Sequence, residues 1–298
     1  MSRNDEQSIL SKPGAIAMIA TKPILDDLAL FFKSIELWNS DLPPIYIACD
    51  TAVDKWLKTI NYSGKINSFP VLDQFTNLTR SSMERTPSQT GFPNLFYDFT
   101  MKKCDVMKWA FEKDSSLTRT GILFCDADIF WLGPLPKIPS TASLALSQHM
   151  IRPGDEAKYG TYNAGFLWIR DPELIAVWKN ACKTSRFFEQ AALEQLIVNP
   201  LHQHVYQFGI EYNYGWWRLY QSDSPFDRRK SEWTIKRDSN QAHSGILVQG
   251  HPLSCIHTHW ETDDFTTKEF NNWVLSKLSV LKGQPKVQKL ISFLVTRY

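Results

Sequence analysis

Two aspartates, Asp126 and Asp128, directly follow an apolar run at residues 121–125. Ligands of open α/β sheets bind beyond the carboxyl ends of the strands, so acids at such an end are placed to meet one. Two carboxylates about 4 Å apart repel each other by a few kcal/mol at an effective dielectric constant of about 20, and a bridging divalent cation removes that repulsion. The pair therefore predicts a metal site, with solvated loop carboxylates as the alternative, because an Asp-x-Asp triplet is expected about once by chance in a chain of this length.

The acids need a rigid sheet to position them, and the first half of the chain predicts one. Short apolar runs alternate with helical patterns around residues 25–35 and 106–111. This alternation is typical of β-α-β units and of a mostly parallel sheet covered on both faces. Residues 70–100 are polar and lack periodicity, so we expect a long functional loop there. The strands are expected at residues 15–20, 45–49, 121–125, 143–147 and 164–169.

The second half of the chain has a different pattern. Residues 172–199 follow a helical periodicity that Pro200 ends. Residues 209–244 interleave tyrosine and tryptophan with charged residues, which fits either a surface that stacks on sugar rings or a small aromatic subcore. Residues 268–298 predict two amphipathic helices broken at residues 283–285. Their apolar faces would dock onto the rest of the chain or attach it peripherally to a membrane.

Composition excludes several classes of function. The 298 residues hold 33 Lys and Arg against 31 Asp and Glu, a net charge of +2, which leaves no global basic surplus for nucleic acid. No apolar stretch approaches the roughly 20 residues of a transmembrane helix. The first 12 residues lack the apolar core of a signal peptide, and the five widely spaced cysteines form no C-x-x-C pair. We therefore expect reduced cysteines in a cytoplasmic protein.

Four segments, in order along the chain, resemble motifs of glycosyltransferases with the GT-A fold. Residues 121–134, Gly-Ile-Leu-Phe-Cys-Asp-Ala-Asp-Ile-Phe-Trp-Leu-Gly-Pro, resemble their Asp-x-Asp strand, and residues 162–170 resemble their Asn-Ala-Gly strand. Residues 189–193 are similar to their acidic-Gln-x-x-Leu helix start. Residues 257–260, with Lys268 beyond them, are similar to their terminal His motif. The four matches span most of the chain.

The resemblance implies a single α/β domain over residues 1–298, with a GT-A type, Rossmann-like, mostly parallel sheet flanked by helices and a small acceptor-side subdomain. Residues 13–135 would bind the nucleotide sugar, residues 136–266 would form the acceptor and catalytic half, and residues 267–298 the C-terminal helices. The motifs are nearest to those of retaining α-xylosyl and α-galactosyl transferases and glycogenin-like enzymes. The Gly and Lys-Pro-Trp of the glycogenin-like motif are missing, so the place within the fold stays open.

The same resemblance implies a metal and its ligands. Asp126, Asp128 and His257 would hold Mn²⁺ or Mg²⁺, with His259 as the second choice for the imidazole. A nitrogen ligand favours Mn²⁺ over Mg²⁺, because imidazole suits transition metals better. A cation so held would stabilise the diphosphate that leaves as a nucleotide sugar reacts. Lys268 would add a positive charge to the phosphates.

Further positions of the motifs imply contacts with the donor. Asn163, Glu189 and Gln190 would be the catalytic, sugar-binding residues, and a strand-entry turn or a helix first turn is the structural alternative for them. Lys103 and Lys108 are alternatives for one basic position, and Thr21 and Asp50 have capping or turn roles as alternatives. The complete set expected to bind the nucleotide sugar is Thr21, Asp50, Lys103, Lys108, Asp126, Ala127, Gly165 and Lys268.

The leading hypothesis is a metal-dependent glycosyltransferase that moves a hexose or pentose from a nucleoside diphosphate sugar, UDP-linked by preference, to a hydroxyl of a saccharide or glycoconjugate. Retention of configuration is favoured, and an inverting enzyme would need Glu211, Asp263 or Asp264 as general base. The alternatives are an inactive sugar- or nucleotide-binding protein and a phosphatase with Asp126 as nucleophile. Phe130 disfavours the phosphatase, because such enzymes carry Thr or Val at that position.

Overall fold

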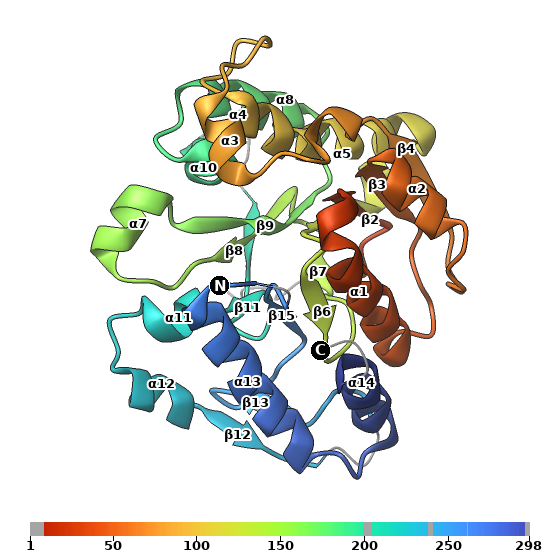
Figure 1. Cartoon of the computed structure of the whole chain (residues 1–298), viewed down its shortest axis with the longest axis vertical. Helices are drawn as coiled ribbons and strands as arrows, with labels where there is room; N and C mark the ends of the chain where they lie inside the picture. The colour runs from red at the N-terminus through yellow and green to blue at the C-terminus, as the bar shows by residue number, and fades with distance from the viewer. Residues whose placement is uncertain (1–8, 199–203, 238–240, 261, 296–298) are drawn as a thin grey trace, which may run out of the picture.

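The computed structural model describes residues 9–198, 204–237, 241–260 and 262–295 (Figure 1). Its largest element is a seven-stranded sheet in the order β10-β8-β9-β5-β2-β3-β4. Strand β9 is antiparallel to both of its neighbours, and the other pairs are parallel. Helices cover both faces, so the predicted α/β class with a mostly parallel, helix-flanked sheet is confirmed. The strands are β2 (Ala15–Ala20), β3 (Ile45–Cys49), β4 (Ile66–Pro70), β5 (Ile122–Cys125), β8 (Leu144–Gln148), β9 (Tyr162–Ile169) and β10 (Val205–Phe208).

The central strands are continuous apolar runs because both of their faces are buried. In β2, Ile16 and Met18 belong to the core that includes helix α1, whereas Ala15 and Ala17 belong to the core that includes helix α5. This alternation is the two-residue period of a strand. All five predicted strands are confirmed to within two residues, whereas the edge strands β4 and β10 were not predicted, because polar residues interrupt them. The helices next to this sheet are α1 (Leu25–Trp38), α2 (Thr51–Leu57), α5 (Lys102–Lys113), α6 (Leu117–Thr120) and α8 (Glu173–Ala181), with η1 (Lys22–Ile24) before α1.

The segment expected as one long loop, residues 70–100, contains three short helices, so that prediction was wrong in part. Each helix is too short for apolar periodicity to show in the sequence. Side-chain caps define two of them: the Thr79 hydroxyl accepts from Ser82 N–H, and the Asn94 amide oxygen accepts from Phe96 N–H. The helices are η2 (Asp73–Phe75), α3 (Arg80–Arg85) and α4 (Leu95–Thr100).

A small sheet joins the middle of the chain to its far end. Strand β15 pairs antiparallel with β6, with His257 opposite Ile129, and parallel with β11. The pairing brings the chain after the two aspartates beside the predicted terminal His motif. The strands of the small sheets are β6 (Ile129–Trp131), β11 (Tyr214–Gly215) and β15 (Cys255–His257); β12 (Trp233–Ile235), β13 (Ile246–Val248) and β14 (His251–Pro252); and β1 (Leu10–Ser11) with β7 (Ile138–Pro139).

Aromatic residues of the second half build a subcore. Tyr214 and Trp233 are buried with ring centroids 4.9 Å apart, and Trp233 also packs against Trp273 at 4.3 Å. The subcore alternative therefore holds for these rings, because a buried ring face is not offered to a sugar. The helical prediction for residues 172–199 is confirmed in part, because the described residues form several short helices interrupted at residues 185–187 and 192–193. Pro200 lies outside the described residues. The remaining helices are α7 (Pro153–Tyr159), η3 (Cys182–Thr184), α9 (Phe188–Ala191), α10 (Glu194–Val198), α11 (Trp217–Tyr220) and α12 (Phe226–Ser231).

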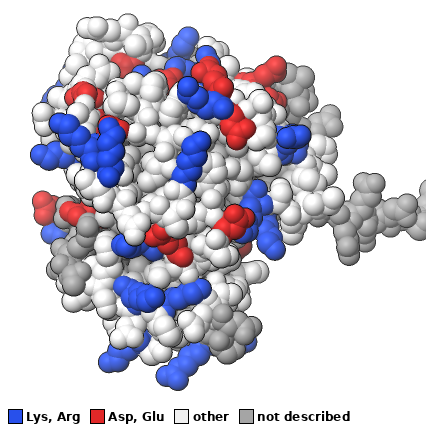
Figure 2. Space-filling model, turned by 90° about the vertical axis from the view of Figure 1, so that its right-hand side faces the viewer, with Lys and Arg blue, Asp and Glu red and all other residues white. Residues whose placement is uncertain are grey.

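The two C-terminal helices, α13 (Phe265–Val280) and α14 (Pro285–Val295), dock onto the rest of the chain. Helix α14 lies beside α1 and buries Val287, Leu290 and Leu294. On the face formed by the right-hand side of Figure 1, acidic and basic side chains intermingle, except at the lower end where basic ones alone are seen (Figure 2). Within the described residues, no helix is both long and apolar enough to cross a membrane. The five cysteines are buried and free of disulfide bonds.

Candidate active site

The loop that carries the two aspartates is fixed at both ends by main-chain hydrogen bonds. Strand β5 ends at Cys125, and Asp126 N–H then donates to Gly165 O of β9 at 2.8 Å. At the other end, Asp128 O accepts from Thr258 N–H at 3.1 Å, beside the pairing of β6 with β15. The loop between the strands is thus held against two segments that come much later in the chain, and it presents both carboxylates on one side.

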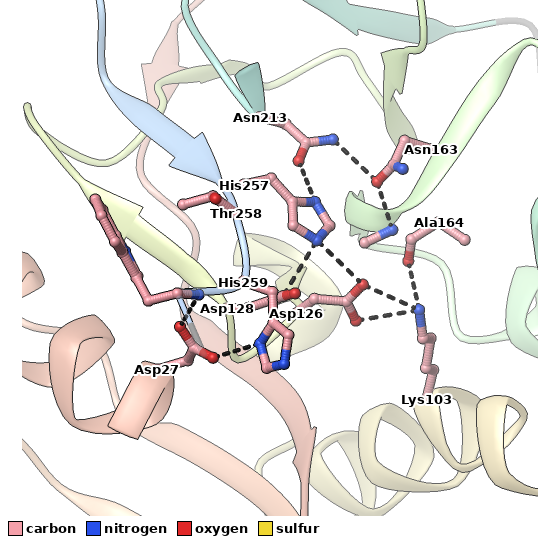
Figure 3. Close-up of polar contacts among 12 residues, drawn as sticks. Asp27, Lys103, Asp126, Asp128, Asn163, Ala164, Asn213, His257, Thr258 and His259 are labelled. Carbon is pink, nitrogen blue, oxygen red and sulfur yellow. Dashed lines mark hydrogen bonds and ion pairs between the residues drawn. The ribbon is translucent and has the colours of Figure 1, made fainter. Parts of the chain in front are cut away.

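The structure brings Asp126, Asp128 and His257 together (Figure 3). His257 Nε2 lies 3.1 Å from Asp128 Oδ1 and 3.9 Å from Asp126 Oδ2. One ligand atom from each residue lies within 4.8 Å of the others. Two carboxylates and an imidazole nitrogen are ligands that Mn²⁺ accepts, so this donor set fits the predicted metal. The grouping gives a physical basis to the choice of His257.

The ionisable groups of this cluster shift one another's pKa values. Burial raises the pKa of Asp126, against the lowering effects of Lys103 and His257. Burial also opposes ionisation of Asp128, but the charge and hydrogen bond of His257 hold the pKa of Asp128 below its usual value. For His257, burial favours the neutral ring, and the two carboxylates outweigh it and raise its pKa. The acids thus need positive charge beside them, which is the property expected of a cation site.

Lys103 reaches the same cluster from α5. Its ammonium lies 3.1 Å from Asp126 Oδ1 and 2.9 Å from Glu189 Oε1, and it donates to Ala164 O at 3.2 Å. Burial favours the neutral amine, but the charges of Asp126 and Glu189 outweigh it and raise the pKa of Lys103 above its usual value. Lys103 is therefore a buried, permanent cation between an acid of the metal cluster and Glu189.

The structure places Lys108 apart from this group, so of the two alternatives for the basic position it is Lys103 that lies beside the acids. The Lys108 side chain is 72% exposed, and its ammonium lies 3.8 Å from Glu112. Five residues along an α-helix correspond to a rotation of about 140°, so Lys103 and Lys108 point to different sides of α5. The sequence could not choose between them, because both lie on the predicted helix.

Residues of β9 and α9 complete one side of the site. Asn163 Oδ1 accepts from Gly165 N–H at 2.9 Å, and Asn163 Nδ2 lies 3.4 Å from Gln190 Oε1. Gln190 in turn donates to Tyr159 O at 2.9 Å. A Cβ atom at Gly165 would lie 2.4 Å from Asp126 Oδ2 and 2.5 Å from His257 Cε1, which is too close for any side chain. Glycine is favoured here because two candidate ligands occupy the space that a Cβ atom would take.

A cavity of about 590 Å³ opens beside the acids. Thr21, at the end of β2, and Ala127 line it with the acids, so the structure places these two predicted donor contacts in the same hollow. Two larger hollows, of about 770 and 710 Å³, lie among other residues and contain none of the predicted site residues. The residues that line the acid cavity include Ile19, Ala20, Thr21, Phe75, Leu78, Arg80, Phe96, Phe99, Lys103, Asp126, Ala127, Asp128, Glu189 and His259.

Three predicted residues have other partners. Asp50 is fully buried as the N-cap of α2, where Oδ1 accepts from Val53 N–H at 2.8 Å and Oδ2 from Lys22 N–H at 2.7 Å, so its capping alternative holds. His259 lines the cavity, but its Nδ1 is 2.5 Å from the buried Asp27, and it is not part of the three-residue cluster. Lys268 lies in the first turn of α13, 3.2 Å from Asp263, and does not line the cavity.

Sequence analysis missed several residues of the site. Asn213 contacts His257, and Asp27 contacts His259. Arg80 lines the cavity. Asp27 lies in the first turn of α1, where acids are common, and Arg80 lies in the segment expected to be a loop. Asn213 lies within the aromatic-rich segment of residues 209–244, whose predicted role rested on its tyrosines and tryptophans. No spacing rule points to any of the three, because their partners are distant in sequence.

Comparison with known proteins gave matches among solved structures alone. No family model and no curated protein matches the chain. The glycosyltransferase GlyE of Streptococcus pneumoniae TIGR4, in its apo form, is 15% identical with a TM-score of 0.49, over 93% of this chain and 64% of GlyE. The galactosyltransferase LgtC, in complex with donor and acceptor sugar analogs, is 14% identical with a TM-score of 0.47, over 88% of this chain and 96% of LgtC. The chain thus spans about 64% of the length of GlyE.

Proposed function

We propose that the protein is a metal-dependent glycosyltransferase of the GT-A type. It would transfer a hexose or pentose from a nucleoside diphosphate sugar, with UDP as the preferred nucleotide, to a hydroxyl of a saccharide or glycoconjugate. The observation that supports this most is the cluster of Asp126, Asp128 and His257 beyond the end of a central strand, in which both aspartates line a cavity that Thr21 and Lys103 also line. Pattern and geometry converge there: the three residues that the motifs predict as ligands are the three whose ligand atoms meet.

The proposed transfer reaction needs positive charge beside the leaving diphosphate. When the bond between sugar and diphosphate breaks, negative charge builds up on the diphosphate, and Mn²⁺ or Mg²⁺ bound by Asp126, Asp128 and His257 would stabilise it. In this proposal Mn²⁺ is the preferred ion, because His257 supplies a nitrogen. Lys103 favours the ionised form of Asp126, and its charge adds to the field that a diphosphate would meet.

The sugar would lie on the β9 and α9 side of the cavity. Glu189 lines the cavity and forms an ion pair with Lys103. This ion pair holds its carboxylate in place as an acceptor for sugar hydroxyls. Asn163 and Gln190 stay predictions for sugar hydroxyls: they do not line the cavity, and a contact would require them to give up present partners such as Gly165 N–H and Tyr159 O. Ala127 would permit close approach to the donor because its side chain is small, and Gly165 leaves room for Asp126 and His257. Lys268 stays a prediction for the diphosphate, and a contact would require it to turn away from Asp263.

Retention of configuration is the stereochemical proposal. An inverting enzyme would need a general base near the acceptor hydroxyl. Glu211, Asp263 and Asp264 do not line the cavity, and Asp264 is engaged as the N-cap of α13 through Thr267 N–H at 2.7 Å. Among the described residues that line the cavity, the carboxylate outside the metal cluster is that of Glu189, and it is paired with Lys103.

The experiment is a release assay over a panel of nucleotide sugars. UDP-, GDP-, TDP- and ADP-linked sugars are incubated with the protein in Mn²⁺ or EDTA, and free nucleoside diphosphate is quantified. We expect slow release from at least one UDP-sugar in Mn²⁺, loss of release in EDTA and in Asp128→Asn, and full release in the matched control Asp41→Asn, an exposed acid on the α1–β3 connection. Metal-dependent binding without release would support the alternative of an inactive binding protein. If the protein shows no binding and no release, the proposal is overturned.

A further inference from the structure

Asn213 is a fully buried polar residue beside the metal cluster. It has a left-handed main chain, with a φ of 53°, directly before β11. Asparagine tolerates this conformation better than most residues, and it is held here by contacts from three sides. Its side chain bonds to His257 Nδ1 at 2.8 Å, to Asn163 Oδ1 at 3.1 Å and to Ser147 Oγ at 3.1 Å. Figure 3 shows Asn213 between His257 and Asn163.

The direction of each hydrogen bond follows from one main-chain group. Gly165 N–H can only donate, so the Asn163 atom 2.9 Å away must be the amide oxygen. The Asn213 atom that faces this oxygen must then be the NH₂ group, which leaves the Asn213 oxygen toward His257. An amide oxygen can only accept, so His257 Nδ1 must carry a proton. A neutral His257 ring therefore has its lone pair on Nε2.

The opposite end of the chain of hydrogen bonds gives the same answer. Gly160 O can only accept, so His149 Nδ1, at 2.7 Å, must donate to it. Burial lowers the pKa of His149 to about 4, so its ring is neutral and Nε2 is an acceptor. The Asn163 NH₂ group donates to this Nε2 at 3.2 Å, which again leaves the Asn163 oxygen toward Gly165 and Asn213. Two independent main-chain groups thus fix one set of donors and acceptors.

A buried arginine holds the turn that presents Asn213. Arg218 is fully buried and donates to Ile210 O and Tyr212 O at 2.8 and 2.9 Å, and to Gln148 O at 2.8 Å. These bonds tie the turn before β11 to the end of β8. Arg218 also donates to Ser147 Oγ at 3.2 Å, the hydroxyl that Asn213 contacts. The position of Asn213 is thus fixed by the fold and does not depend on a ligand.

We propose that Asn213 is a positioning residue that keeps the proton of His257 on Nδ1 and so directs the lone pair of Nε2 at Asp126 and Asp128. The inference rests on the proposed function for the identity of the metal. When the ring is neutral, Nε2 faces Asp128 Oδ1 at 3.1 Å with a lone pair on each atom, an arrangement that a proton on Nε2 or a bound cation relieves. Partners that orient a metal-bound histidine change metal affinity by about 10- to 100-fold when removed. Asn213 also joins the metal cluster to Asn163, on the sugar side of the site.

The first test uses the wild-type protein. Histidine ¹⁵N shifts are recorded with Mg²⁺ bound and in metal-free protein at pH 9, and the His257 signals are assigned by their loss in His257→Gln. We expect Nδ1 to be protonated and Nε2 to be unprotonated in both samples. A proton on Nε2 and none on Nδ1 would overturn the proposal, whatever the protein binds.

The second test measures Mn²⁺ binding, by electron paramagnetic resonance of the free ion, in three variants. Asn213→Leu removes the acceptor and should weaken binding about 10- to 100-fold. Asn213→Asp keeps an acceptor toward His257 and should stay within about tenfold of the wild type. Ser147→Ala removes another partner of Asn213 and should leave affinity and the Nδ1 proton unchanged. A folded Asn213→Leu that binds Mn²⁺ as the wild type does would contradict the inference. If the wild type itself does not bind Mn²⁺, the proposed function fails, and the ¹⁵N pattern alone decides on Asn213.

Discussion

Replacing Gly165 by alanine tests the close packing of the site with one methyl group. The added Cβ would lie 2.4 Å from Asp126 Oδ2, 2.5 Å from His257 Cε1 and 2.9 Å from Asn163 Oδ1, whereas ordinary contacts begin at 3.4 Å. Asp126 or the main chain must therefore move by at least 3.4 − 2.4 = 1.0 Å. Metal–ligand distances tolerate only about 0.2 Å. We expect a loss of Mn²⁺ affinity of about 10- to 100-fold, with a strain cost of about 1–3 kcal/mol in the free energy of unfolding.

The assay pairs Mn²⁺ calorimetry with urea unfolding. The matched control is Gly154→Ala in α7, where a Cβ would meet no atom within 4 Å and φ is not left-handed. This control should bind Mn²⁺ as the wild type does, and its unfolding free energy should rise by about 0–1 kcal/mol. A folded Gly165→Ala with an unchanged dissociation constant would show that the candidate ligands do not need the observed spacing. An equal loss of Mn²⁺ affinity in Gly165→Ala and Gly154→Ala would also contradict the prediction, because the loss would then not depend on the contacts at Gly165.

Three further predictions concern buried groups. Lys103→Met leaves two carboxylates without their buried cation and should cost about 3–5 kcal/mol in urea unfolding, whereas exposed Lys108→Met should stay within about 0.5 kcal/mol; equal costs would refute the assignment. Burial lowers the pKa of His149 to about 4 in the folded chain, against its usual 6.5 when unfolded. As the pH drops from 6.5 to 4, the unfolded chain therefore binds the proton first, and the free energy of unfolding falls by up to about 3 kcal/mol. Subtracting the pH dependence of His149→Gln from that of the wild type isolates this contribution, and no difference between them would contradict it. All five cysteines are buried and free, so a thiol reagent should label none in native protein and five after unfolding; rapid native labelling would show that a strand opens.

The central sheet could be predicted because its strands are buried on both faces. Continuous apolar runs such as residues 15–20 have few other interpretations, and the structure places β2 on those residues. The edge strand β4 carries Asn67 and Ser68 and could not be distinguished from a loop. The helices within residues 70–100 depend on caps and on burial of single side chains, neither of which produces a periodic pattern.

The candidate site could be predicted where a residue type and its place on a strand carry the information. Asp126 and Asp128 follow a recognisable strand, and motif order singled out His257. Choosing Lys103 over Lys108 required the rotation of α5 relative to the sheet, which no local pattern supplies. Asn213 could not be predicted, because its role depends on the parallel pairing between β11 and β15 and on a turn held by buried hydrogen bonds.

The most direct measurement of the central claim is calorimetric titration of UDP into the protein, once with excess Mn²⁺ and once with EDTA, in the wild type and in Asp128→Asn. If the acids and His257 hold the ion that binds the diphosphate, UDP should bind one to one in Mn²⁺, and its affinity should fall at least tenfold in EDTA and in the variant. Equal UDP affinity in all four titrations, or no UDP binding in any, would contradict the account.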